Sequence, residues 1–550
     1  MHKFFRNSTI CISALLIISC GVKRSMKYQP NIENITVKTS LDVQTDSFRK
    51  VNEHFLQKNK YNNWELKVRG SSQEIGHYSG LLTQDLYQYQ EKAFFDNLQT
   101  TVPSKLKQKV LLGFLRWYNR EMYQYIPDSY LKEIYSLSQF SSNQYNWVAP
   151  KFQRALFLHG AHDIGHAMQD LAIVGCSSLA VWDQNTESGD LLIGRNFDFY
   201  VGDTFAENKL IQFIQPNDGF AFASVSWPGM VGVVSGMNVK GITVTLNAAK
   251  SDIPLKAKKP VSIVAREILQ YAQTIDQAIA IAKNSEVFVS ESLLIGSASE
   301  NTAVVIEISP KKFDVYVPSQ DYLICTNHFQ SAAYKNDARN QEHVKNSHTE
   351  YRFQVIEKNM QNHFVWNPNK MAKLLRSTEG LYAESIGLGN EKALNQLMAH
   401  HAVIFEPKQL KMWVSSSPYQ LGAMVCYDLN TIFNENQNTA KLFDDSQTIA
   451  ADTTFIQTAY PNYIAYRTQK KDILNAIKNK QSVSEQKLID FINLNPDLWK
   501  VYDLVGQIQF KKGFYTVAKQ NFEKALACEI PYETDRVRIE NQLKKTNKKL

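Results

Sequence analysis

The sequence predicts an α+β protein in which sheets and helices are sandwiched in one central domain, with helical segments before and after it. Two observations carry this prediction. Short apolar and β-branched runs lie between residues 171 and 246 and again between residues 292 and 429, and a pair of helical segments separates the two groups. Residues 61–170 and the segment after residue 463 instead carry apolar residues at helical spacing.

The composition narrows the classes of function. Charged residues make up 21% of the 550 residues and hydrophobic residues 44%, which excludes a wholly disordered chain. The net charge of +8 is spread along the chain and forms no basic stripe, so we expect no nucleic-acid partner. Six cysteines are too few for a disulfide scaffold and lack the paired spacing of a metal site, and we expect no metal and no cofactor.

The N-terminus has the pattern of an export signal. Residues 1–20 begin with a short basic stretch and continue with an apolar run that is too short to span a membrane, since a span needs ~20 apolar residues. The run ends in IISC at Cys20, which resembles a bacterial lipoprotein cleavage box. That resemblance implies a lipid on Cys20, an exported protein anchored to a membrane surface and, because Gly21 follows, the outer membrane. A plain secretory signal is the alternative.

The patterns divide the chain into six parts. They are a signal peptide (1–20), a polar tether (21–60), a helical prosegment (61–175), a catalytic domain (176–429), a polar linker (430–463) and a helical tail (464–550). In the central domain, LAIVGCSSLAVW and LLIGRNFDFY flank the turn-rich loop DQNTESGD and predict a hairpin. The helix pair begins after Pro260, and Thr274 with Gln277 predicts a capping box for its second helix. Further strands are predicted at SLLIGSA, TAVVIEI, FDVYV, YLICTN, HAVIFEP and KMWVSS.

The tail has the offsets of a helical repeat. Gly506, Ala518, Phe522 and Ala525 are spaced as in a tetratricopeptide repeat (TPR), where small residues let two helices pack closely. One unit is visible, whereas stable arrays need ~3 repeats. A partner-binding array and a helical cap on the preceding domain therefore both remain open.

The predicted hairpin brings together three residues whose side chains could take part in a reaction. Cys176 lies at the head of its first strand, and Arg195 and Asp198 lie at the end of its second strand. Adjacent antiparallel strands lie ~4.8 Å apart, so both side chains can reach the thiol. A nearby cation lowers the pKa of a thiol and raises the fraction of thiolate, which is the nucleophile.

These residues resemble a known family. GCSSLAV together with GRNFDFY resembles the N-terminal nucleophile (Ntn) cysteine hydrolases, and among them the acyl-coenzyme A:6-aminopenicillanic acid acyltransferase group, related to penicillin V acylase and choloylglycine (bile salt) hydrolase. The resemblance implies a four-layer αββα sandwich. It also implies that the precursor cuts itself between Gly175 and Cys176, that the freed α-amine is the general base for the Cys176 thiol, and that Asp198 positions this amine. The working chain would then begin at residue 176.

Three later segments resemble the family in the same order. GMNVKGITVTLN ends in Asn247, CTNHF contains Asn327, and YRF contains Arg352. The resemblance implies that Asn327 and Asn247 bind the oxyanion. It also implies that Arg195 and Arg352 adjust the reactivity of the thiolate and the electrostatic field of the site. Amide donors aimed at a developing oxyanion are typically worth ~3–4 kcal/mol of barrier each.

A histidine-rich stretch, LHGAHDIGHAMQD, invites a metal interpretation. His159, His162 and His166 share one helix face, with Asp163 beside them. No second cluster of His or carboxylate residues completes a metal site. We therefore favour histidines that pack in a helix, or form hydrogen bonds near the expected cut, over metal ligands.

The sequence therefore predicts a self-activating acyltransferase or amidohydrolase that acts on a small-molecule N-acyl amide, or acyl donor, through a thioester on Cys176. The alternative is a non-enzymatic surface lipoprotein with a degenerate hydrolase domain and a partner-binding tail. Self-cleavage distinguishes the two. The acyl chain, the amine, the choice between hydrolysis and transfer, and the oligomeric state stay open.

Overall fold

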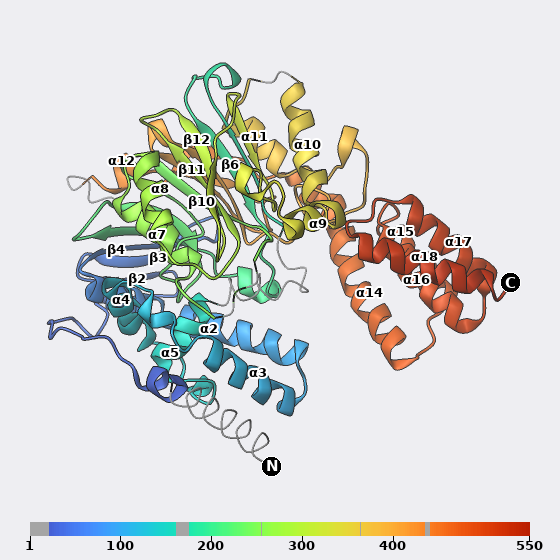
Figure 1. The fold of residues 1–550 in the computed structure, drawn as a ribbon, viewed down its shortest axis with the longest axis horizontal. Helices are drawn as coiled ribbons and strands as arrows, with labels where there is room; N and C mark the ends of the chain where they lie inside the picture. Colours follow the sequence, from blue (N-terminus) through green and yellow to red (C-terminus); the bar gives the residue numbers. More distant parts are fainter. Residues whose placement is uncertain (1–20, 161–174, 253, 255, 363–364, 435–440) are drawn as a thin grey trace, which may run out of the picture.

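Two sheets stacked face to face form the centre of the molecule (Figure 1). The computed structural model describes residues 21–160, 175–252, 254, 256–362, 365–434 and 441–550. Among these residues, eleven strands form the first sheet in the order β1 (Val43–Gln44), β2 (Phe48–Val51), β3 (His54–Lys58), β4 (Trp64–Gly70), β7 (Leu210–Pro216), β8 (Phe222–Ser226), β9 (Ser235–Asn238), β10 (Ile242–Ala248), β11 (Glu291–Ser297), β12 (Thr302–Ile308) and β13 (Phe313–Tyr316). In the same described ranges, seven strands form the second sheet in the order β14 (Tyr322–Cys325), β5 (Ser177–Val181), β6 (Leu192–Phe197), β15 (His401–Glu406), β16 (Lys411–Ser415), β17 (Met424–Asp428) and β18 (Phe443–Ile449).

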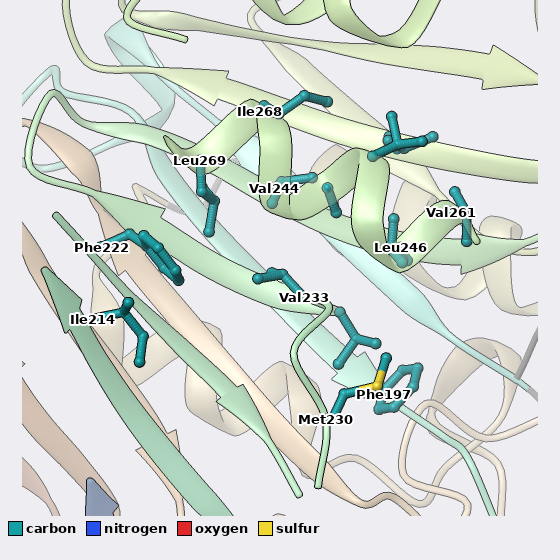
Figure 2. Close-up of a cluster of buried hydrophobic side chains, with 14 of the residues drawn as sticks. Phe197, Ile214, Phe222, Met230, Val233, Val244, Leu246, Val261, Ile268 and Leu269 are labelled. Atoms are coloured by element: carbon teal, nitrogen blue, oxygen red, sulfur yellow. The ribbon is translucent and has the colours of Figure 1, made fainter. Parts of the chain in front are cut away.

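Buried clusters show that the architecture has four layers. Between the sheets, Phe213 and Leu294 of the first sheet share a cluster with Ile193 and Val403 of the second. The outer face of the first sheet is covered by α7 (Val261–Tyr271) and α8 (Ile275–Lys283). Figure 2 shows side chains of α7 above β10, and its labelled residues include Val261, Ile268, Leu269, Val244 and Leu246.

The second sheet has its own helical cover. Helices α10 (Thr349–Gln361) and α11 (Pro368–Leu375) contribute Ile356 and Met371 to a cluster with Leu179 and Val181 of β5. The order is helix, sheet, sheet, helix, so the predicted αββα sandwich is confirmed. Its inner strands read as continuous apolar runs because layers cover both of their faces.

Residues before the expected cut are part of the sandwich, which differs from the polar tether and the purely helical prosegment expected there. Residues 43–70 form β1 to β4, and β4 pairs in parallel with β7, from Trp64 opposite Leu210 to Gly70 opposite Pro216. The strand was missed because polar residues interrupt its apolar pattern. Glu65 is nevertheless fully buried, since Asn59 donates to its carboxylate at 2.6 Å and the Tyr427 hydroxyl of β17 donates at 3.0 Å.

Helices follow these strands, as predicted for the segment before the cut. They are α2 (Ser72–Thr101), α3 (Lys105–Tyr118), α4 (Asp128–Ser138) and α5 (Lys151–His159). Helix α2 begins with a capping box formed by Ser71 and Glu74, and its Ile75 and Leu82 enter the cluster under α7. Thus α2 packs on the first sheet of the sandwich and does not form a separate unit.

The expected polar linker also contains a strand. Strand β18 pairs with β17 as the edge of the second sheet, and α13 (Thr453–Gln457) follows it. Asn, Asp and Thr are frequent in this segment, and such a composition is typical of a linker. It also suits β18, because a half-exposed edge strand needs few apolar side chains.

The tail is helical, as predicted. It comprises α14 (Ala459–Asn479), α15 (Glu485–Asn493), α16 (Trp499–Lys512), α17 (Tyr515–Ala527) and α18 (Glu533–Asn547), and Figure 1 shows it beyond α9 (Ala338–Asn346) and α10. Gly506 lies against Phe522, and a Cβ atom at Gly506 would be 2.7 Å from that ring, so a small residue is required there. The likeness to a TPR stays a prediction. Among the described helices, none is long and apolar enough to cross a membrane.

Candidate active site

The hairpin of β5 and β6 places the candidate nucleophile. The two strands form the predicted antiparallel hairpin, in which Ser178 lies opposite Arg195 and Ser177 opposite Asn196. Cys176 directly precedes β5 and Asp198 directly follows β6, so both lie at the same end of the hairpin. The backbone N–H of Gly175 donates to the backbone carbonyl of Asp198 at 3.2 Å, which ties the two segments together.

Arg195 lies beside the thiol. Its Nη2 is 3.6 Å from Sγ of Cys176, and both side chains are fully buried. The guanidinium lies over the ring of Phe197, with Cζ 4.2 Å from the ring centroid, and donates through Nη2 to the Leu246 carbonyl. Burial raises the pKa of the Cys176 thiol to about 11, while Arg195 opposes this rise. The uncut chain therefore holds a protonated thiol.

Asp198 carries a fully buried carboxyl group beside the thiol. Among the described residues, neither of its carboxylate oxygens has a hydrogen-bond partner, and the side chain is 0% exposed. Burial raises the pKa of Asp198 to about 7, against the opposing effects of Arg352 and Arg195. Such a group favours the arrival of a cation or a donor, because leaving it unpaired costs free energy.

Arg352 connects both sides of the expected cut. It lies on α10 and is fully buried. Its Nη1 donates to the carbonyl oxygen of Gly175 at 3.1 Å, to that of Cys176, and to Oγ of Ser177 at 2.8 Å. Its Nη2 donates to Oδ1 of Asn327 at 2.6 Å. One side chain thus orients the Gly175–Cys176 peptide and a second candidate residue.

Gln396 is a site residue that the sequence did not reveal. Its Nε2 donates to the Gly175 carbonyl at 3.0 Å, and the side chain is 2% exposed. A Cβ atom on residue 175 would lie 2.4 Å from that same nitrogen, so any larger residue there would displace the Gln396 side chain. The segment around Gln396 carries none of the recognised motifs, and no pattern in the sequence pointed to it.

The two candidate oxyanion residues differ. Asn327 accepts from Arg352, and its Nδ2 donates to the Ala248 carbonyl at 2.9 Å, which leaves one amide hydrogen available. Nδ2 of Asn247 donates to the carbonyls of Cys325 and Thr326 at 2.9 and 3.3 Å. Asn247 is therefore engaged in joining β10 to the end of β14, and Asn327 is the better placed donor.

A buried hydrogen-bond chain lies behind Arg195. Its Nη1 donates to Oγ of Ser235 at 2.6 Å, and Oγ lies 2.8 Å from Nε2 of His401. The Nδ1 atoms of His401 and His400 are 2.8 Å apart. Burial lowers the pKa of His400 to about 3, with a further contribution from Lys209, so the pair is neutral at physiological pH. These residues also escaped the sequence motifs.

His159 is satisfied within the protein. Its Nδ1 lies 2.8 Å from the carbonyl of Ala155, and its Nε2 accepts from the backbone N–H of Val231 at 2.9 Å. Burial lowers its pKa to about 4. His162, Asp163 and His166 lie outside the described residues, as does Cys20. Within the described ranges, no group of three or more His, Cys, Asp or Glu residues is placed to hold a metal ion.

A small apolar cavity adjoins the hairpin end. It measures about 30 Å³ and is lined from upstream of the cut by Tyr87 and Phe94, and from downstream by Phe199, Phe205 and Trp227. Phe199 follows Asp198 directly, so the cavity lies next to the candidate site and is shared by the two sides of the cut.

Known proteins resemble parts of this chain. Residues 184–417 match the family model described as acyl-coenzyme A:6-aminopenicillanic acid acyl-transferase. An uncharacterized protein of Archaeoglobus fulgidus is 32% identical over 27% of this chain and 26% of its own length. Protein dcd1B of Dictyostelium discoideum is 25% identical over 34% of this chain and 35% of its own length. The chain thus spans about a quarter to a third of the length of these curated relatives.

Among solved structures, a Caenorhabditis elegans ortholog of N-acylethanolamine-hydrolyzing acid amidase matches 42% of this chain and 93% of its own, at 16% identity and a TM-score of 0.31. A mutant of the conjugated bile acid hydrolase from Clostridium perfringens matches 50% of this chain and 98% of its own, at 13% identity and a TM-score of 0.32. These TM-scores are too low to support a fold assignment, which therefore rests on the four layers of helices and sheets described above. The match of residues 184–417 to this family model confirms the family resemblance inferred from the motifs of the central region.

Proposed function

We propose that this protein is a self-activating Ntn amidohydrolase or acyltransferase, which cleaves linear N-acyl amides through a thioester on Cys176. The observation that carries the proposal is the environment of the Gly175–Cys176 peptide. Two buried side chains, Arg352 and Gln396, donate to its carbonyl oxygen, and a buried thiol lies beside it, as does a carboxyl group with no hydrogen-bond partner among the described residues.

The first reaction would be cleavage of the chain itself. The Cys176 thiol adds to the carbonyl carbon of Gly175, its proton passes to the peptide nitrogen, and the C–N bond breaks to leave a thioester. Water then hydrolyses the thioester, which yields a carboxylate on Gly175 and a free thiol and α-amine on Cys176. Negative charge develops on the Gly175 oxygen during the addition, where Arg352 and Gln396 already donate.

The new α-amine would complete the site. An α-amine has an ordinary pKa of ~7.7–8.0, which suits proton transfer near neutral pH. Its ammonium form would supply a partner for the Asp198 carboxyl group, whose oxygens have no hydrogen-bond partner among the described residues. Asp198 would therefore act as a positioning residue for the base.

The amidase cycle would repeat this chemistry on a substrate. The amine takes the thiol proton, the thiolate attacks the substrate carbonyl, and the amine returns the proton to the leaving amine. Arg352 and Gln396 lie downstream of the expected cut and would remain in the site, where Asn327 and Arg195 would add further donors to the developing charge. We favour water over an acceptor amine as the second reactant because water is always present and acyl-coenzyme A is absent from exported compartments.

The size of the purified chain tests the proposal. Wild-type protein should yield two fragments, of which the larger begins with Cys176, whereas Cys176→Ala should remain one chain. Cys426→Ala is the matched control, because Cys426 is another free, buried cysteine, on β17. A single chain for wild type would favour a non-enzymatic lipoprotein with a degenerate hydrolase domain.

The activity itself is tested with a panel of N-acyl amides. Mass spectrometry of processed protein mixed with each amide should detect an acyl group on Cys176 for at least one member. No adduct with any member, in protein that does cleave itself, would leave self-processing standing and contradict the amidase.

We further propose that the protein is exported and held at a membrane surface, with the outer membrane favoured, by a lipid on Cys20. The sequence pattern of residues 1–20 supports this. Mass spectrometry of the N-terminal peptide should find a lipid on Cys20, and Cys20→Ser should release the protein from the membrane fraction.

A further inference from the structure

The C-terminal tail reaches the candidate site through two hydrogen bonds. The hydroxyl of Tyr532, which directly precedes α18, lies 3.0 Å from Nε2 of His348. Nδ1 of the same histidine accepts from Nε of Arg352 at 3.0 Å. Arg352 in turn donates to Gly175, Cys176 and Asn327, so two residues separate the tail from the expected scissile bond.

The geometry defines the protonation state of the histidine. Nε of Arg352 always carries a hydrogen, so Nδ1 of His348 must offer its lone pair. Burial, together with Arg352, holds the pKa of His348 well below its ordinary value, so the ring is neutral. A neutral ring that accepts at Nδ1 carries its proton on Nε2, and this proton is donated to the Tyr532 hydroxyl. The tyrosine therefore favours the tautomer that orients Arg352.

A second contact joins the tail to the other flank of the site. Arg467 on α14 donates to Oδ1 of Asp203 at 2.6 Å and to the hydroxyl of Tyr200 at 2.8 Å. Both acceptors lie in the segment that leaves β6 directly after Asp198. The tail thus holds the helix that carries Arg352 and also the loop that follows Asp198.

We propose that the tail is an integral part of the catalytic unit and that Tyr532 is a positioning residue, which acts through His348 on Arg352. This inference rests on the proposed function, because the effect is measured on self-cleavage and on amide turnover. It assigns the tail a role that requires no external protein partner.

Tyr532→Phe tests the inference with the removal of one oxygen atom. The ring contact with His348, at 5.1 Å between centroids, is retained. We expect the self-cleavage rate and kcat to fall about three- to tenfold, the size expected for the loss of one buried hydrogen bond. KM should be unchanged, and the melting temperature should fall by only a few degrees, since one hydrogen bond contributes about 1 kcal/mol to folding stability. Tyr502→Phe is the matched control, because the Tyr502 hydroxyl donates to the Pro496 carbonyl inside the tail.

A double-mutant cycle checks the route of the effect. If Tyr532 acts through His348, then Tyr532→Phe should have little further effect on the self-cleavage rate in a His348→Ala background. Additive effects, or a Tyr532→Phe variant that cleaves and turns over like wild type, would overturn the inference while the proposed function stands. A wild-type chain that neither cleaves itself nor forms an acyl adduct would instead overturn the proposed function, and the inference with it.

Discussion

Gln396 provides the sharpest test of self-cleavage, because it is one of two side chains that donate to the Gly175 carbonyl. Gln396→Met keeps an unbranched chain of similar length and removes only the donor. Removal of one oxyanion donor typically costs ~3–4 kcal/mol of barrier. Arg352 still donates from 3.1 Å, so we expect the lower end of that range, a self-cleavage rate about 100-fold slower than wild type.

The assay follows newly synthesised chain in a cell-free reaction. Samples are quenched over time, and the fraction of uncut chain gives the rate. Gln153→Met is the matched control, since Gln153 is buried to a similar degree (3% exposed, against 2% for Gln396) and donates to the carbonyls of Ser25 and Tyr28. A Gln396→Met chain that is folded and cleaves at the wild-type rate would refute the role of Gln396.

Three further predictions concern stability. After cleavage, the two fragments should elute together in size-exclusion chromatography and separate only in denaturant, because β4 of one is paired with β7 of the other; separation under native conditions would contradict this. Burial raises the pKa of Asp198 from its ordinary value of 3.8 to about 7, so the folded chain keeps a proton that the unfolded chain releases, and stability falls as pH rises from about 4 to about 7. In uncut Cys176→Ala protein, Asp198→Asn should remove up to about 4 kcal/mol of this pH dependence of the unfolding free energy, measured by denaturant titration; an unchanged slope would contradict it. Arg154→Met should destabilise the chain by ~3–5 kcal/mol in the same titration, because Glu91, 1% exposed and 2.7 Å from Nε of Arg154, loses its buried partner; a loss below about 1 kcal/mol would count against this.

The catalytic hairpin was predictable because its information is local. Two apolar runs flank a loop of turn-forming residues, and this pattern places Cys176, Arg195 and Asp198 at one end without knowledge of the rest of the fold. The later motifs were predictable only from the family resemblance, which indicated Asn327 and Arg352 but also assigned Asn247 the same oxyanion role. The structure instead engages Asn247 with two backbone carbonyls.

Two strands, β4 inside the first sheet and β18 at the edge of the second, were not predictable from local pattern. β4 carries Glu65 and Lys67 among its apolar residues, and β18 reads as a polar linker. Whether such segments are strands depends on partners that are distant in the chain. The Tyr427 hydroxyl of β17 satisfies the carboxylate of Glu65, and β17 supplies the backbone hydrogen bonds for β18.

The sequence by itself thus indicated most strands and helices of the central domain, the hairpin and the candidate nucleophile at its head, because apolar periodicity and turn residues act over a few neighbours. Only the tertiary structure decided which side chains surround the Gly175 carbonyl. Gln396 lies 221 residues from Gly175, and Tyr532 lies 184 residues from His348. Their hydrogen bonds exist because the packing of the sheets, of α10 and of the tail brings these residues together, and no local pattern encodes that packing.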